Sequence, residues 1–249
     1  MKITGNTILV TGGGSGIGRE LARRWHDAGN HVIVAGRREE ALRETIGERE
    51  NMTAYAVDVD DAAALRSFVE RLLAEHPQLN VLVNNAGIMR IEDATARRDL
   101  ADAEATIATN LLGPIRLIDA LIDHLQTQPD AVIVNVTSGL AFVPLPDTPT
   151  YSATKAAIHS YTLALRKLLE GKVEVIELAP PGVQTDLTPG QAARPGYQPL
   201  DEFIDQVMEQ FGQQPTPPEI LVERVKQLRF AERDGTVEER LTMLASLQR

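Results

Sequence analysis

Tyr151 and Lys155 are the two residues of this chain whose types and spacing most directly suggest chemistry. They stand four positions apart in the stretch YSATK, so on a helix they share one face. A tyrosine with a pKa of ~10 is a poor acid or base near neutral pH unless its ionised form is stabilised. A neighbouring ammonium lowers that pKa by favouring the phenolate. Such pairs are also common by chance on helix surfaces, so the pair alone leaves both interpretations open.

A serine precedes this pair at a suitable place. Ser138 follows the β-branched run Val132–Val136 and comes shortly before Tyr151. Its hydroxyl can hold the oxygen of a substrate in line with the tyrosine. The three side chains together predict proton transfer to or from an oxygen-bearing substrate.

Glycines near the N-terminus predict a site for a pyrophosphate. The stretch TGGGSGIG, residues 11–18, follows an apolar strand and precedes the helical run Arg19–Ala28. Glycine lets the backbone approach a pyrophosphate, whose charge is stabilised by free N–H groups and the positive end of the helix dipole. The alternative is an ordinary strand-to-helix turn, which the flanking strand and helix make less favourable. The candidate binding residues are Gly12, Gly14, Ser15, Gly16, Ile17 and Gly18.

Two arginines indicate which dinucleotide would bind. In a dinucleotide-binding fold, an acidic residue at the end of the second strand usually binds the adenosine ribose and would repel a 2′-phosphate. Here that strand ends in Gly36, Arg37 and Arg38, and the first carboxylate is Glu39. A guanidinium can bind a 2′-phosphate through two hydrogen bonds, so the sequence predicts NADP(H) rather than NAD(H). The alternative is that both arginines only begin a solvated helix.

Short β-branched runs alternate with helical periodicity along the chain. Apolar strands joined by crossovers indicate a parallel sheet covered by helices on both faces. We therefore predict one α/β domain, residues 1–249, of the doubly wound Rossmann type. An excursion at about residues 186–215, with the proline- and glycine-rich segment Thr188–Gln198 and a helix Leu200–Phe211, would cover the site. The expected strands are Thr7–Val10, His31–Ala35, Thr53–Val57, Val81–Asn84, Val132–Val136 and Val173–Leu178.

Composition narrows the class of protein. The net charge of −10 over 249 residues repels phosphate backbones and anionic membrane surfaces, so we expect neither nucleic acid nor a membrane as a partner. The chain has no cysteine, and its five histidines show no ligand spacing, so no metal site is expected. The apolar run Ile8–Val10 is too short for a secretory signal or a membrane span, which predicts a cytoplasmic protein.

The motifs together resemble the classical short-chain dehydrogenase/reductase family over nearly the whole chain. The matching stretches are TGGGSGIG, the pair Asp58-Val59, NNAG at residues 84–87, Asn110, Ser138 with YSATK, and the turn at residues 180–185. The resemblance implies that Tyr151 is the general acid or base and that Ser138 orients the carbonyl. It also implies that Lys155 lowers the tyrosine pKa and binds the nicotinamide ribose, and that Asn110 completes the tetrad.

The same resemblance implies further cofactor contacts. Asp58 and Val59 would lie at the adenine, although a lone aspartate at a strand end is often only a turn former. Pro181 stands where the family usually has glycine, a variant that resembles its DltE-like branch. The remaining contacts are Asn85, Ala86 and Gly87 near the adenosine ribose, and Pro181, Val183 and Thr185 near the carboxamide.

Pro114 gives Asn110 a physical rationale of its own. Proline has no N–H, so the carbonyl of Asn110, four residues earlier, lacks its usual helical partner. That carbonyl can hold a water leading from Lys155 to solvent, which is the proton relay that the resemblance implies. The alternative is a kink in a packed helix.

The C-terminal sequence departs from the family's pattern. It shows no convincing seventh strand, only helical sequence from Pro217 through Leu247, so the tetramer contact often made there is in doubt. We expect a homodimer through the helices that bear Asn110 and Tyr151, unless their apolar stripe faces this chain's own sheet. The stripe consists of Ile107, Leu111, Ile115, Ile118 and Ile122.

The predicted function is hydride transfer between NADP(H) and a carbonyl compound or secondary alcohol, a hydrophobic small molecule. Arg90 could attract a carboxylate, although exposed arginines are common. The alternatives are a non-catalytic NADP(H)-binding regulatory module and a structural subunit. The predicted substrate wall is apolar and consists of Leu140, Ala141, Phe142, Val143 and Met89.

Overall fold

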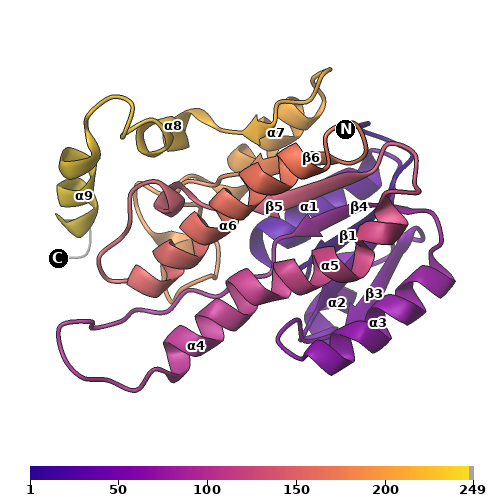
Figure 1. The fold of residues 1–249 in the computed structure, drawn as a ribbon, viewed down its shortest axis with the longest axis horizontal. Coiled ribbons are helices and arrows are strands. Elements are labelled where there is room, and N and C mark those ends of the chain that lie inside the picture. Colours follow the sequence, from indigo (N-terminus) through magenta and orange to yellow (C-terminus); the bar gives the residue numbers. More distant parts are fainter. Residues whose placement is uncertain (247–249) are drawn as a thin grey trace.

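The computed structural model describes residues 1–246 and shows strands and helices alternating along the chain (Figure 1). A π-helical turn, Ala108–Leu112, joins α4 to α5, and short 3-10 turns lie at Gly139–Ala141 and Gln191–Ala193. The strands are β1 Thr7–Thr11, β2 His31–Gly36, β3 Met52–Ala56, β4 Leu79–Asn84, β5 Val132–Val136, β6 Glu174–Leu178 and β7 Glu219–Ile220. The helices are α1 Gly16–Asp27, α2 Glu39–Ile46, α3 Ala62–Glu75, α4 Ala101–Ile107, α5 Gly113–Leu125, α6 Pro149–Leu168, α7 Leu200–Phe211, α8 Glu223–Arg229 and α9 Val237–Ser246.

The strands of the described residues form one seven-stranded parallel sheet in the order β3-β2-β1-β4-β5-β6-β7. β1 pairs with β2 along one edge and with β4 along the other. The chain therefore builds the sheet in one direction from β1 to β3 and in the opposite direction from β4 to β7. In such sheets ligands bind where the order reverses, outside the carboxyl ends of the strands. The predicted doubly wound α/β fold is confirmed.

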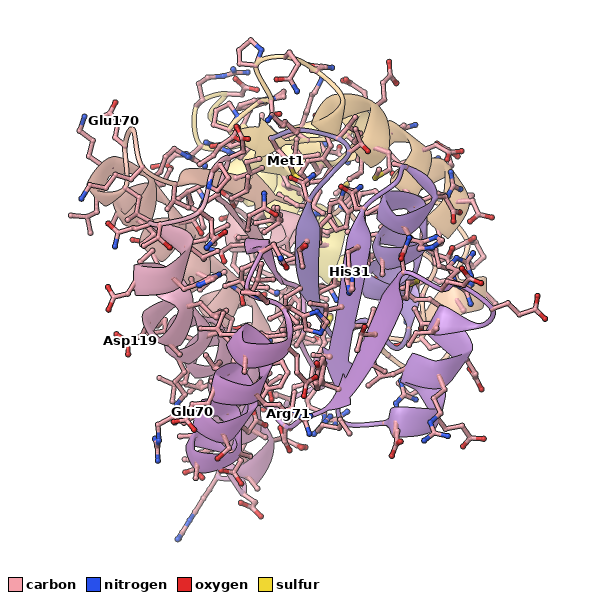
Figure 2. The ribbon with its side chains drawn as sticks, turned by 90° about the vertical axis from the view of Figure 1, so that its right-hand side faces the viewer. Met1, His31, Glu70, Arg71, Asp119 and Glu170 are labelled. Atoms are coloured by element: carbon pink, nitrogen blue, oxygen red, sulfur yellow. The ribbon has the colours of Figure 1, made fainter. Side chains whose placement is uncertain are left out.

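Alternate side chains of each strand enter two apolar layers. Ile8 and Val10 of β1 belong to a core cluster with α1, α2, α7 and α8, whereas Leu9 between them belongs to a cluster with α3, α5 and α6. Figure 2 shows the sheet from the side, with Glu70 of α3 and Asp119 of α5 on the second of these faces. Burial on both faces makes the strands read as continuous apolar runs. For this reason the bounds of the expected strands agree with the structure to within two residues.

Helix α7 has the bounds expected for it, but its apolar side chains lie in the core. Phe203, Ile204 and Val207 are fully buried. Phe211 is also buried and packs edge to face on Trp25 of α1, with 5.4 Å between the ring centres. The second half of the 186–215 excursion is therefore part of a core layer, and only the segment before it lies near the carboxyl ends of the strands.

The expectation of no seventh strand is wrong. β7 pairs with Glu177 and Leu178 of β6 at the edge of the sheet. A strand of two residues carries no periodicity, so the sequence pattern could not reveal it. Its first residue, Glu219, is held by two hydrogen bonds from the Arg229 guanidinium, 2.8 and 2.9 Å long.

The expected helical stretch after Pro217 is also interrupted. α8 and α9 are separated by a turn in which Gly235 has a φ of 69°, a conformation that favours glycine. Both helices lie at the end of the molecule where α6 begins (Figure 1). Leu247, the last residue of the expected stretch, lies outside the described residues.

The helical segment Ala101–Leu125 is long and apolar enough to cross a membrane by length and composition alone. Its inner side chains pack in the core, since Leu117, Ile118 and Leu121 are each exposed by 2% or less. A buried helix of a folded domain passes the same composition test. Within the predicted dimer stripe, Ile118 therefore faces this chain's own core, whereas Ile107 is 40% exposed.

Candidate active site

A cleft opens at the carboxyl ends of β1 and β4. Its volume of about 540 Å³ lies within the range of small-molecule sites, roughly 300–1,000 Å³. Lys155, Pro181 and Val183 are absent from its lining, and Val183 is buried in the core instead. The predicted cofactor residues that line it are Gly12, Gly14, Ser15, Gly16, Ile17, Gly18, Arg37, Arg38, Asp58, Val59, Asn85, Ala86, Gly87, Tyr151 and Thr185.

The glycine loop touches the segment after β4. A Cβ on Gly18 would lie 2.3 Å from Nδ2 of Asn85, and a Cβ on Gly12 would lie 2.9 Å from Cα of Ala86. Gly12 and Gly16 also have positive φ values of 66° and 52°. Gly12 meets both constraints, which only glycine can satisfy. The loop therefore lies directly on the segment after β4, and its backbone at the start of α1 fits a pyrophosphate.

Thr11, at the end of β1, joins the two walls of this cradle. Its hydroxyl accepts hydrogen bonds from the amides of Asn85 and Ala86, 3.0 and 3.1 Å long. The side chain of Asn85 donates to the carbonyl of Thr11 at 2.9 Å. The sequence motif placed Asn85 beside the cofactor but did not indicate that Thr11 holds it there.

Arg37 and Arg38 lie at the cleft, as predicted from the end of β2. Both are exposed, and Arg38 donates to the hydroxyl of Ser15 at 3.2 Å. Within residues 1–246 neither guanidinium forms an ion pair with a carboxylate. Asp58, across the same part of the cleft, accepts a hydrogen bond from the amide of Asp60, so it is a turn former as well as a lining residue.

Tyr151 and Lys155 are both buried in the first turns of α6. The Lys155 ammonium lies 5.6 Å from the centre of the Tyr151 ring and donates to the carbonyl of Val136 at 2.8 Å. Burial lowers the pKa of Lys155 to about 8. Burial raises the pKa of Tyr151 to about 12, an effect that a hydrogen bond with Ser138 opposes.

The net shift of the Tyr151 pKa in this structure is therefore upward, and the lowering expected from Lys155 stays a prediction. The loss of water around the phenol outweighs the hydrogen bond with Ser138, which lowers the pKa. The sequence could not indicate this, because the burial of Tyr151 comes from segments distant in the chain.

Ser138 lies at the start of the turn after β5, where it is 8% exposed. Its hydroxyl oxygen accepts a hydrogen bond from the amide of Leu140 at 3.1 Å, and it also bonds Tyr151. Because that oxygen already accepts the Leu140 amide, its own proton is available to a second partner. The structure thus brings Ser138 and Tyr151 together, as predicted.

Asn110 lies in the π-helical turn and holds the backbone of Ile88 with its side chain. Its Oδ1 accepts from the Ile88 amide at 2.8 Å, and its Nδ2 donates to the Ile88 carbonyl at 2.9 Å. Pro114 follows in the first turn of α5. Asn110 therefore fixes the residue next to Gly87, a contact that the sequence did not reveal.

Tyr197 is a second residue that the sequence did not single out. Its ring covers Gly182, where a Cβ would lie 3.1 Å from the ring, and Arg194 donates to its hydroxyl at 3.2 Å. Its charge contributes to the raised pKa of Tyr151, so the two phenols lie near one another. Only its position in the excursion after β6 could have pointed to it.

Comparisons with known proteins agree with this geometry. The sequence model described as short chain dehydrogenase matches residues 6–195. The uncharacterised oxidoreductase DltE of Bacillus subtilis is 43% identical over 239 residues, which cover 94% of each chain. A short chain dehydrogenase of Burkholderia cenocepacia, solved with NADP, has a TM-score of 0.83 at 25% identity and covers 97% of this chain and 99% of its own. A 3-ketoacyl-(acyl-carrier-protein) reductase of Brucella melitensis, solved with NADH, has a TM-score of 0.71 at 30% identity over 75% of this chain and 79% of its own.

These similarities show an oxidoreductase that acts on an alcohol or a carbonyl compound with a nicotinamide cofactor. The two solved structures contain different forms of that cofactor, NADP and NADH. The choice between the two in this protein therefore has to be argued from its own cleft.

The buried lysine leads to a prediction about stability and pH. The fall of the Lys155 pKa from 10.5 to about 8 corresponds to a cost on the order of 3 kcal/mol at neutral pH, relieved as the pH rises from about 8 to 10.5. The sign follows because the unfolded chain binds more protons than the folded chain in this window, so stability rises with pH. The difference in free energy of unfolding between Lys155→Met and the parent should therefore change by roughly 1 kcal/mol in favour of the parent between pH 7 and pH 9.

Urea unfolding at the two pH values measures this change. Lys167→Met on the same helix is the matched control, since the Lys167 side chain is 81% exposed. A difference between Lys155→Met and the parent that is independent of pH would show that Lys155 keeps its ordinary pKa.

Proposed function

Because the chain belongs to the short chain dehydrogenase family, we propose that it transfers hydride between NADP(H) and a carbonyl compound or secondary alcohol with an apolar body. The observation that carries this proposal is the burial of Tyr151 and Lys155 on one turn of α6, beside a cleft lined by the glycine loop. The bound nicotinamide supplies or accepts the hydride. The side chains of the protein hold the substrate oxygen and move the proton.

Tyr151 is the proposed proton donor during reduction. Its pKa of about 12 keeps the phenol protonated near neutral pH, so its proton is available to a carbonyl oxygen that gains negative charge. Ser138 donates its own proton in a hydrogen bond to the same oxygen. The ammonium of Lys155 then stabilises the phenolate that the transfer leaves.

Asn110 is proposed to act beside these residues. Its side chain fixes Ile88 next to the cofactor wall. Its backbone carbonyl, which Pro114 cannot bond, is proposed to hold a water between Lys155 and solvent. Proton return to Tyr151 would follow this path.

Arg37 and Arg38 support NADP(H) over NAD(H). They lie at the cleft with Ser15, and the carboxylate that would repel a 2′-phosphate is missing from the end of β2. Two exposed guanidinium groups can bind a phosphate bidentately. Asp58 still has an oxygen free to accept a hydrogen bond from the adenine amino group.

The apolar character of the substrate is supported by the walls near Tyr151. Leu187 lines the cleft and is 37% exposed, and Met89 and Leu140 pack on an apolar cluster that contains Leu228. Phe142 and Val143 were expected to line the substrate wall, but they lie behind it. Phe142 packs on His159 and Arg229, and Val143 is fully buried, so both would support the wall from behind. The segment at residues 185–198 is the proposed cover.

A homodimer through the helices that bear Asn110 and Tyr151 is also proposed. Four large apolar side chains on these helices are at least 39% exposed. Ile118 is not available for such an interface, because it is buried in the chain's own core. Burying such side chains against a second copy would be favourable. The four are Ile107, Leu112, Leu163 and Leu168.

The proton donor is tested with Tyr151→Phe. Loss of the phenol proton should lower kcat by about 10²–10⁴-fold in a screen of apolar ketones and alcohols, while NADPH binding is kept. Tyr161→Phe, on the same helix, is the matched control and should keep its turnover. Wild-type turnover in Tyr151→Phe would remove Tyr151 from the mechanism, and binding of NADPH without any turnover in the wild type would favour a non-catalytic regulatory or structural subunit.

Cofactor choice is tested by the melting temperature with NADPH, NADH or neither. NADPH at ~100 times its Kd should stabilise the protein by about 2.7 kcal/mol, and NADH at the same concentration by much less. Arg37→Ala should weaken NADPH binding by about 10-fold or more, the value of a charged hydrogen bond, with little change for NADH. Arg43→Ala is the control, because Arg43 pairs with Glu39 on the exposed side of α2. An equal loss of affinity for both cofactors would contradict the 2′-phosphate assignment.

The oligomeric state is tested by sedimentation equilibrium. A homodimer should give twice the chain mass of 27.2 kDa. A mass equal to one chain at micromolar concentration would reject the dimer and leave the exposed side chains of α4 and α6 solvated.

A further inference from the structure

Glu92 is a buried carboxylate outside the residues discussed so far. It lies in the segment that leaves β4, and its side chain is only 2% exposed. Its Oε2 accepts a hydrogen bond from the backbone amide of Thr150 at 3.1 Å, across a separation of 58 residues in sequence. Its own amide donates to the carbonyl of Asp147 at 2.8 Å. Both bonds go to the start of α6, where Tyr151 is the next residue.

Helix α6 has no cap of its own at this end. The residue before its first turn, Thr148, makes no side-chain capping bond, and its hydroxyl has no partner in the described part of the chain. Pro149 has no N–H to satisfy. The Thr150 amide is therefore one of the unsatisfied donors of the helix, and Glu92 satisfies it from another segment. A carboxylate is also favoured at this end of the helix dipole.

The segment that bears Glu92 is fixed at its other end by the site itself. Gly87 lines the cleft, and the backbone of Ile88 is held on both sides by the Asn110 amide. The short stretch from Ile88 to Glu92 thus runs from the cofactor wall to the start of the helix that carries Tyr151. Its two anchors set the position of the phenol relative to that wall.

Burial of the carboxylate needs a compensating charge, which Arg98 supplies. Its Nη1 lies 3.4 Å from Oε2 of Glu92. The second oxygen, Oε1, is buried without a hydrogen-bond partner in the described residues. The Thr150 amide and Arg98 together offset the cost of burying this carboxylate, which holds its oxygen in place as an acceptor.

We propose that Glu92 is a positioning residue for Tyr151, which caps α6 from the segment after β4 and sets the register of the phenol against the cofactor wall. This proposal rests on the proposed role of Tyr151 as proton donor. Displacement of a reacting group by about 1 Å can cost up to about 10²-fold in rate. The cofactor itself is held by the glycine loop and does not depend on Glu92.

The test compares Glu92→Ala, Glu92→Gln and the parent in kcat, KM and the Kd for NADPH. Glu92→Ala should lose about 10-fold in kcat or more, with the Kd for NADPH within about twofold of the parent. Glu92→Gln keeps an acceptor for the Thr150 amide and should recover most of kcat. Glu70→Ala is the matched control, since Glu70 is an exposed carboxylate on α3 (Figure 2) and does not line the cleft.

Parental kcat in Glu92→Ala would overturn the proposal, as would a parallel loss of kcat and NADPH affinity, which marks a general structural role. If Glu92→Ala does not fold, Glu92→Asp replaces it, because its carboxylate is one methylene shorter and should lower kcat at unchanged Kd. The Tyr151→Phe variant separates the two proposals. If Tyr151→Phe keeps its turnover, the proposed function fails, whereas loss in Tyr151→Phe with parental kcat in Glu92→Ala rejects only the positioning role.

Discussion

The contact between the glycine loop and the segment after β4 is the constraint on which the rest of the site depends. Gly12 and Gly18 approach Asn85 and Ala86 so closely that no side chain fits at either glycine. The contact is possible because β1 and β4 are parallel neighbours whose carboxyl ends lie together, and the Thr11 hydroxyl binds the two segments. The first turn of α1 then presents its free N–H groups to the cleft. The nucleotide cradle is thus a consequence of strand order, and Tyr151 is added to its lining from α6.

The burial of Tyr151 and Lys155 on α6 lowers stability, but it strengthens the electrostatic interaction between the two groups. Removing water raises the pKa of Tyr151 to about 12 and lowers that of Lys155 to about 8, so both groups are moved toward their neutral forms. The carbonyl of Val136 compensates the ammonium only in part. In the same dry environment, a charge on one group acts strongly on the other. Ionising the phenol therefore depends on positive charge held close to it, which couples the state of Tyr151 to Lys155 and to the ligand beside them.

The sequence predicted those features that local pattern determines. The strands, the bounds of α7 and the glycine loop all follow from apolar runs or from glycine spacing, which are properties of a few consecutive residues. β7 was missed because it has two residues and depends on Arg229, ten positions later, for its place. Glu92 gave no signal because its partner amide lies 58 residues away. The upward shift of the Tyr151 pKa was missed for the same reason, since burial comes from packing among distant segments and has no signature in the motif itself.

The proposed substrate wall includes contacts with parts of the chain beyond the family-model match. The family match ends at residue 195, yet a Cβ on Gly139, the residue after Ser138, would lie 2.9 Å from Leu228 and 3.0 Å from Val225 of α8. Arg229 of the same helix stacks on Phe142, 4.8 Å from the ring centre. Helix α8 thus packs on the turn that follows Ser138. Substitutions in α8 can reshape the turn after Ser138 without changing the glycine loop or the YSATK motif, so the motifs identify the family's reaction and leave the substrate open.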